Sequence, residues 1–173
     1  MKLTIQNSGK VVFVGITRPG LLTTAFVLNL LLGSFLTFLS YAVILGAPAD
    51  LSNGQFLFQL MLWFAPGFWY LVYNFIDLKM YAKSTQIELS DNGVTVTSKS
   101  IKHSLSAPIS FENLAGITVN QSFYQRIFGI ASVAITTESH EGFSPWGFLH
   151  DEAVKFSQEV LEKHRVLIRS VKK

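Results

Sequence analysis

The sequence has no cysteine and little charge, and both deficits restrict what the protein can be. Without cysteine the chain can form no disulfide framework and no thiolate zinc site, and it has no thiol nucleophile. Charged residues make up 14% of the chain, against roughly 25% in a typical soluble protein. The deficit is concentrated between Pro19 and Asp77, where Asp50 is the only Asp, Glu, Lys or Arg.

Two long apolar runs fill this uncharged stretch, over residues 21–45 and 56–76. As helices they would be about 37 and 32 Å long, enough to cross a hydrocarbon core of roughly 30 Å. Residues 46–55 between them contain Gly, Pro, Asn and Asp, which are typical of a turn. The sequence therefore predicts a transmembrane helical hairpin over residues 21–77.

Two other interpretations of the apolar runs are weaker. Helices in a soluble core can be apolar, but two uncharged runs of more than about 18 residues are rare there. Ala47-Pro-Ala49 resembles a signal-peptide cleavage site, yet the run before it exceeds the roughly 7–15 apolar residues of a signal peptide. We therefore expect the first helix to remain uncleaved.

Positive charge flanks the predicted hairpin on one side only. Lys2, Lys10 and Arg18 precede the first run, and Lys79 and Lys83 follow the second, whereas the connecting loop has no Lys or Arg. Cytoplasmic flanks carry such an excess of positive charge. The pattern predicts a multi-pass protein of the cytoplasmic membrane with both termini in the cytoplasm.

The few polar residues within the spans favour packing over transport. We expect Asn29 to form a hydrogen bond with Tyr70 across the hairpin, and Gly33 and Thr37 to permit close helix contact. Pro66 is expected to kink the second helix. Since neither run contains Asp, Glu, Lys, Arg or His, nothing marks an ion or proton pathway.

The remainder of the chain, residues 78–173, has the composition of a folded domain, with 11 Lys and Arg and 9 Asp and Glu. Alternating residues on either side of Asp91-Asn-Gly93 predict a β-hairpin over 85–99. Short apolar alternations at 117–119 and 133–135 predict further strands, and hence an antiparallel sandwich or barrel. An amphipathic helix capped by Asp151 is expected to close it.

The first twenty residues also have β character. Residues 3–6 and 11–16 are apolar-rich and are separated by a turn at Asn7-Ser-Gly9, which predicts a cytoplasmic β-hairpin segment over 1–20. Two strands alone are marginally stable. We therefore expect this segment to dock on the C-terminal domain.

The layout and one local motif resemble the membrane-flanked bacterial pleckstrin-homology-like family (YdbS-like), with the YcxB-like group as a close alternative. The motif comprises residues 109–114, 117–122 and 126–133 with 135–137, and Thr17-Arg-Pro19 is similar to the family's entry to the first helix. The resemblance implies a PH-like α+β domain, an antiparallel β-sandwich or barrel capped by a C-terminal helix. It also implies a bacterial inner-membrane protein with no known catalytic activity.

Within this resemblance, a small basic group is the candidate ligand site. Lys99, Lys102 and His103 follow the second predicted strand, where PH domains often bind anionic lipid headgroups, and a solvated loop is the simpler alternative. Arg126 is the fourth candidate, either as an anion contact or as a partner for a loop carbonyl or for the C-terminus of the helix. Gly129 is expected to need a positive φ angle.

No motif for catalysis, metal or cofactor binding is present. The sequence lacks Gly-x-Ser-x-Gly, Gly-x4-Gly-Lys and His-Glu-x-x-His, and its four histidines are scattered. The net charge of residues 78–173 is only +2, without a basic stripe, which argues against nucleic acid. We therefore expect no enzyme and no cofactor.

The leading hypothesis is an interaction module that binds a protein partner or its own copies at the membrane. The alternatives are an inner-leaflet anionic lipid sensor and, less favoured, a small transport or channel accessory subunit.

Overall fold

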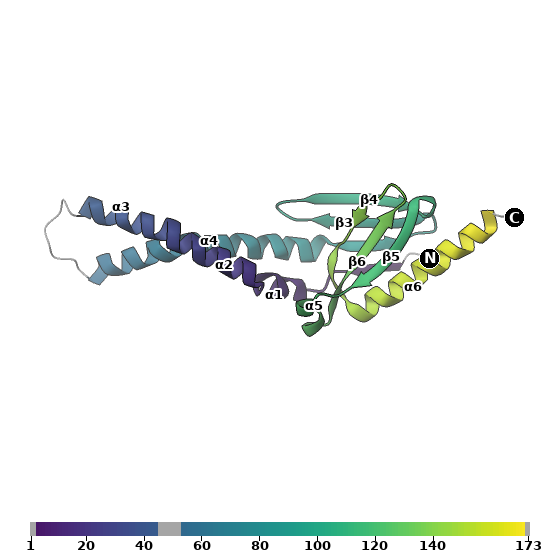
Figure 1. Cartoon of the computed structure of the whole chain (residues 1–173), viewed down its shortest axis with the longest axis horizontal. Helices are drawn as coiled ribbons and strands as arrows, with labels where there is room; N and C mark the ends of the chain where they lie inside the picture. The colour runs from purple at the N-terminus through teal and green to yellow at the C-terminus, as the bar shows by residue number, and fades with distance from the viewer. Residues whose placement is uncertain (1–2, 45–52, 172–173) are drawn as a thin grey trace. The chain divides into compact units, whose positions relative to one another are not determined.

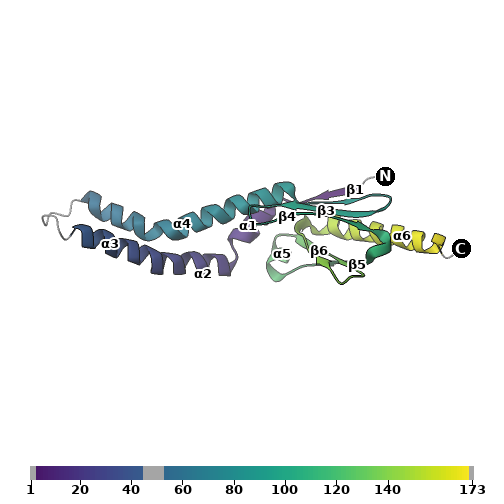
Figure 2. The same cartoon turned by 90° about the horizontal axis from the view of Figure 1, so that it is seen from above.

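The computed structural model describes residues 3–44 and 53–171, with side chains described for residues 3–41 and 54–167. The chain divides into two compact units. The first, here called the folded domain, comprises Met1–Val14 and Asp77–Lys173. The second, here called the helical unit, comprises Gly15–Ile76. Figures 1 and 2 show their elements from two sides.

One sheet of the folded domain joins the two ends of the sequence. Its four strands lie in the order β1-β2-β3-β4, and neighbouring strands are antiparallel: β1 (Leu3–Gln6), β2 (Gln86–Leu89), β3 (Gly93–Lys99) and β4 (Ser104–Ser110). The predicted hairpin over 85–99 is confirmed as β2 and β3. A Cβ atom at Gly93 would collide with the carbonyl oxygen of Ile109 on β4, so the turn between β2 and β3 requires glycine.

The second sheet contains the other predicted strands. It is built from β5 (Leu114–Asn120), β6 (Ile130–Thr137), β7 (Gly142–Phe143) and β8 (Trp146–Leu149), with both β7 and β8 paired to β6. The short helices η2 (Phe111–Asn113) and α5 (Phe123–Ile127) flank β5. Strands β4 and β8 were not predicted, because β4 is serine-rich and contains Pro108, and β8 contains Gly147. Proline is tolerated in β4 because this strand is a sheet edge.

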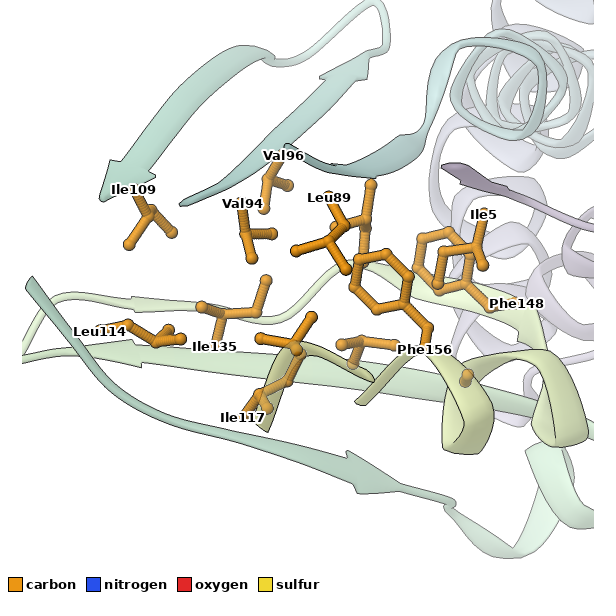
Figure 3. Close-up of a cluster of buried hydrophobic side chains, with 14 of the residues drawn as sticks. Ile5, Leu89, Val94, Val96, Ile109, Leu114, Ile117, Ile135, Phe148 and Phe156 are labelled. Atoms are coloured by element: carbon orange, nitrogen blue, oxygen red, sulfur yellow. The ribbon is translucent and has the colours of Figure 1, made fainter. Parts of the chain in front are cut away.

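A single apolar core lies between the sheets and the C-terminal helix α6 (His150–Val171) (Figure 3). Phe148 from β8 and Phe156 from α6 are its largest fully buried side chains. Helix α6 starts at His150, whose N–H donates to the carbonyl of Gly129, so Asp151 lies in the first turn rather than at the predicted N-cap. The expected α+β architecture, with antiparallel sheets and a closing C-terminal helix, is therefore present.

The predicted N-terminal β-hairpin is half wrong. Residues 3–6 form β1 and dock on β2, as expected. The second predicted strand is instead helix α1 (Lys10–Ile16). Val11 and Val14 are both buried, and residues three apart share one face of a helix. In a continuous apolar run such as Val11–Ile16, periodicity does not distinguish helix from strand.

The helical unit contains the two predicted apolar helices. The first consists of α2 (Pro19–Leu28), the π-helix η1 (Asn29–Gly33) and α3 (Ser34–Ile44), and the second is α4 (Asn53–Ser84). The predicted loop lies largely outside the described residues, since 45–52 are not described. Helix α4 continues past the predicted end at Ile76, and its residues from Asp77 belong to the folded domain. Within the described residues, Pro19–Tyr41 and Gly54–Ser84 are long and apolar enough to cross a membrane.

The two helices meet through the predicted small and polar residues, with one different partner. The side-chain oxygen of Asn29 accepts a hydrogen bond from the Gly67 N–H at 2.7 Å, rather than pairing with Tyr70. Gly67 follows Pro66, and in a regular helix its N–H would bond to the carbonyl of Trp63. A Cβ atom at Gly33 would collide with that same carbonyl. Close backbone approach at Gly33 and Gly67 thus defines the helix contact.

Candidate functional site

Three of the four candidate residues lie together on one turn. Lys99 ends β3, and Lys102 and His103 belong to the turn that leads into β4. All three are exposed. Within this turn the Ser100 hydroxyl accepts hydrogen bonds from the N–H groups of Lys102 and His103, each at 3.2 Å. The turn therefore presents its basic side chains from an ordered backbone.

The last turns of α4 hold the β3–β4 turn in place. The carboxylate of Asp77 accepts a hydrogen bond from the Ile101 N–H at 2.7 Å and lies 4.0 Å from the Lys102 ammonium. The Ser84 hydroxyl accepts from the Lys99 N–H at 2.8 Å. In the sequence Asp77 is notable only as the first charged residue after the uncharged stretch. Its contacts with the β3–β4 turn were therefore not predicted. Asp77 also offsets part of the positive charge of the turn.

Arg126, the fourth candidate, lies on a different connection. It is exposed on α5, between β5 and β6. Ser122 and Gln125 form a capping box that fixes the start of this helix. The side chain of Gln121 donates to the carbonyl of Ile130 at 2.9 Å, and Gly129 adopts the expected positive φ of 65°. Among the described residues, no hydrogen bond from the Arg126 side chain to a loop carbonyl is present.

Both connections lie at one end of the folded domain, which we call the basal end (Figures 1 and 2). The basal end comprises the β3–β4 turn, α5, α1 as far as Val14, and residues 77–84 of α4. The Lys10 ammonium on α1 donates to the carbonyl of Phe128, which follows α5, at 3.3 Å. The Tyr81 hydroxyl on α4 accepts from the Trp146 N–H at 3.0 Å. These contacts connect the separate segments of the basal end through the adjoining strands.

The opposite, distal end comprises the β2–β3 turn, η2 and the β6–β7 turn. Hydrogen bonds join these segments, from the Phe111 N–H to Asn92 and from the Glu138 N–H to Asn113. The distal end carries four acids: Asp91, Glu112, Glu138 and Glu141. A hydrogen bond from Lys163, 3.0 Å away, lowers the pKa of the Asp91 carboxyl. The domain is therefore polarised, with its basic turn at one end and its acidic turns at the other.

A groove of about 390 Å³ opens where the edges of the two sheets approach each other. It is lined by β4, by Asn113 and by the β6–β7 segment. Ile109 and Thr137 form buried parts of its surface, whereas Pro108 and Ser139 are exposed. Strand β4 is a sheet edge, so one side of its backbone is not paired with another strand. The groove thus combines apolar surface with unpaired backbone groups.

The described residues hold no group of three or more His, Asp or Glu side chains that could bind a metal ion. The candidate site offers ammonium, imidazole and guanidinium groups on an exposed surface. Such groups bind anions or a protein surface.

Comparison with known proteins gives a family match. The family model described as "Bacterial PH domain" matches residues 20–169. None of the curated proteins matches the chain. Among solved structures, the pleckstrin homology domain of USP37 is similar at 9% identity and a TM-score of 0.35, over 47% of this chain and 79% of that one.

Proposed function

The chain belongs to the bacterial PH-domain family, and from that premise we propose that it is a membrane-anchored, non-catalytic module that binds a protein partner. PH domains are typically interaction modules rather than enzymes. The observation that carries the proposal is the contrast between the two units. One is a PH fold with a complete apolar core, and the other leaves most of its apolar side chains exposed.

Exposure of the apolar helices supports anchoring in the bacterial inner membrane. Only 11% and 6% of the most apolar windows of the two candidate spans are buried, whereas core helices of a soluble protein bury most of such a surface. Pairing of β1 with β2 brings the segments before and after the two spans into one sheet. Both flanks of the hairpin then lie on the same side of the bilayer. Lys and Arg in those flanks favour the cytoplasmic side.

The groove beside β4 is the surface that best fits a protein partner. An extended peptide can add to an open sheet edge by main-chain hydrogen bonds, with alternate side chains entering an adjoining pocket. Edge strand β4 and the groove lined by Ile109 and Phe143 supply both features. The acidic Glu141 at its rim favours a partner segment that carries positive charge.

Site-specific photocrosslinking in cells tests this function. A photoreactive residue replaces Ser139 at the rim of the groove, and the matched control carries it at the exposed Gln158 on α6. We expect a discrete crosslinked product from position 139 that disappears when excess unlabelled protein is expressed. A product of twice the chain mass would identify a second copy as the partner. Identical products from both positions, or none from 139, would contradict partner binding at the groove.

Anionic lipid headgroups are a second candidate ligand, favoured by the ordered, exposed β3–β4 turn. We expect the triple substitution of Lys99, Lys102 and His103 by Gln to weaken binding of phosphatidylglycerol to the full-length protein. Binding of added lipid is measured by native mass spectrometry after delipidation. Arg126→Gln, on a separate connection, is expected to have a smaller effect. Equal lipid binding by the parent and the triple variant would exclude this candidate.

A further inference from the structure

Exposed apolar side chains of the folded domain are concentrated at its basal end. Within the described residues of the domain, eight large apolar side chains are exposed. Val166 and Leu167 lie on α6, and the remaining six belong to the basal elements: Phe13, Met80, Ile101, Phe123, Tyr124 and Ile127. A large exposed apolar patch on a folded domain marks a surface that contacts a protein or a membrane.

Helix α5 reverses the arrangement expected of a helix that faces water. Gln125 is 5% exposed and donates from its side-chain amide to the Ser132 hydroxyl at 2.8 Å. Phe123 and Ile127, by contrast, are 73% and 63% exposed. The capping box and the Gln125 contact fix the orientation of the helix. Its apolar side chains are therefore held outward by polar contacts made on the inner side.

The charge around this patch suits an anionic surface. Seven basic residues belong to the basal elements: Lys10, Lys79, Lys83, Lys99, Lys102, His103 and Arg126. Three acids oppose them: Asp77, and Asp151 and Glu152 in the first turn of α6, which begins beside Gly129. Basic residues thus outnumber acids at the basal end, whereas the turns of the distal end carry four acids. The apolar patch and the positive charge thus coincide.

The chain also leaves the folded domain at this end. The domain's two segments stop at Val14 and start again at Asp77. Asp77 is bonded to the β3–β4 turn, and α1 is bonded to Phe128 through Lys10. If the apolar helices lie in a bilayer, both covalent connections keep the basal end close to it. Water-exposed Phe123 and Ile127 would then lie within reach of the lipid.

From these observations we propose that the basal end docks on the bilayer interface, with Phe123 and Ile127 of α5 inserted among the lipid headgroups. Aromatic and aliphatic side chains beside cations are typical of surfaces that bury an apolar face in the headgroup region. Lys102 and Arg126 then contact lipid phosphates. This inference depends on the membrane anchoring proposed above but not on the protein partner.

The test uses the full-length protein as single copies in nanodiscs that contain phosphatidylglycerol. Because the chain has no cysteine, one introduced cysteine carries an environment-sensitive fluorophore at a unique position. Phe123→Cys reports on α5, Phe38→Cys on the first apolar helix and Ser139→Cys on the distal end. We expect lipid-borne quenchers to quench the labels at 38 and 123 and to leave the label at 139 unquenched.

The outcomes separate this inference from the proposed anchoring. Quenching at 38 but not at 123 would overturn docking of α5 and leave the anchoring intact. No quenching at 38 would overturn the anchoring itself. Since a single-copy nanodisc contains no second copy and no protein other than its scaffold belt, quenching at 123 by lipid-borne quenchers does not depend on a protein partner. If α5 were instead a protein-binding surface, its label would be as unquenched as the label at 139.

A second variant set tests whether the α5 side chains themselves dock the domain on the bilayer. With the label on Tyr124→Cys of α5, away from the covalent connections, the double substitution Phe123→Ser and Ile127→Ser is expected to reduce quenching strongly. Val166→Ser, an equally exposed apolar residue on α6, is the matched control and should leave quenching unchanged. Fluorescence of Trp146, in a background with Trp63→Phe and Trp69→Phe, checks that each variant is folded. Unchanged quenching in the folded double variant would overturn the proposal.

Discussion

Phenylalanine side chains behave in opposite ways in the two units. In the folded domain Phe148 and Phe156 are fully buried, whereas in the helical unit Phe38 and Phe56 are 69% and 63% exposed. The same residue type is therefore core in one unit and surface in the other. In water, burial of such a side chain stabilises a fold by about 1.5–3 kcal/mol. The bilayer proposed above would supply apolar surroundings for the exposed phenylalanines of the helical unit.

The difference also changes what holds each unit together. Apolar burial stabilises the domain, but between helices in lipid it contributes little, because lipid tails are as apolar as leucine. The helix crossing of the helical unit uses small residues and a hydrogen bond, at Gly33, Gly67 and Asn29, which suits the proposed membrane setting. Substitutions should thus destabilise the two units by different mechanisms.

The largest expected effect comes from the buried core. Phe156→Ala leaves a cavity and should cost the domain about 3–5 kcal/mol. Urea unfolding is followed by Trp146 fluorescence in a background with Trp63→Phe and Trp69→Phe, so that only the domain is observed. Phe38→Ala is the matched control and should leave this transition unchanged. Similar losses from both substitutions would remove the distinction between the units.

Gly33→Val should break the close contact of the apolar helices. Its side chain would meet the Trp63 carbonyl, and overpacking of this kind costs about 1–3 kcal/mol. Thermal denaturation in mild detergent measures the loss for the full chain. Gly20→Val provides the control, because a Cβ atom at Gly20 has no neighbour within 4 Å. An equal fall in thermal stability for both variants would show that the contact at Trp63 is not the cause.

A smaller loss is expected when Asn29 is replaced by Leu. The variant lacks the acceptor for the Gly67 N–H, and polar contacts between membrane helices contribute about 0.6 kcal/mol on average. The same denaturation assay applies. Thr23→Val is the control, since the Thr23 hydroxyl donates to the Pro19 carbonyl within its own helix. If Thr23→Val were the more damaging change, the interhelical bond would not be the source of stability.

The smallest effect concerns Asp91 at the distal end. Its pKa is lowered in the folded state by the hydrogen bond from Lys163, so any stability from this carboxylate is present above the usual Asp pKa and lost as the pH falls below it. The group is exposed, and salt screens such a pair. Asp91→Asn should therefore destabilise the domain slightly at pH 7 and low salt, by an amount that shrinks as the pH falls below the usual Asp pKa. A difference that grows on acidification would reverse the sign.

Local signals explain which parts of the fold were predictable. Asp91-Asn-Gly93 specifies a turn by its own chemistry, so β2 and β3 followed from the sequence. The run at Val11–Ile16 gave the wrong element because its helical form depends on the burial of Val11 and Val14 against the domain. Strand β4 carries little apolar signal of its own and depends on pairing with β3.

The candidate site was predictable only in part, for a related reason. A loop after the second strand was expected, and Lys99, Lys102 and His103 lie there. The role of Asp77 depends on the tertiary contact between α4 and that loop, which no local pattern encodes. The exposed side chains of α5 were missed because apolar residues in a short segment are ordinarily read as core. The buried Gln125 among them reverses that interpretation only when the structure is known.

Pairing of β1 with β2 has a consequence for biosynthesis. Leu3 leaves the ribosome long before its partner Leu89, and both apolar helices are made in the interval. The N-terminal strand must remain unpaired until the nascent chain has passed through the hairpin. If the two apolar helices cross a membrane as proposed, closure of the sheet requires that the second crossing has returned the chain to the side where it began. A chain inserted with a single crossing would leave β2 without its edge strand, which makes completion of the sheet a check on correct insertion.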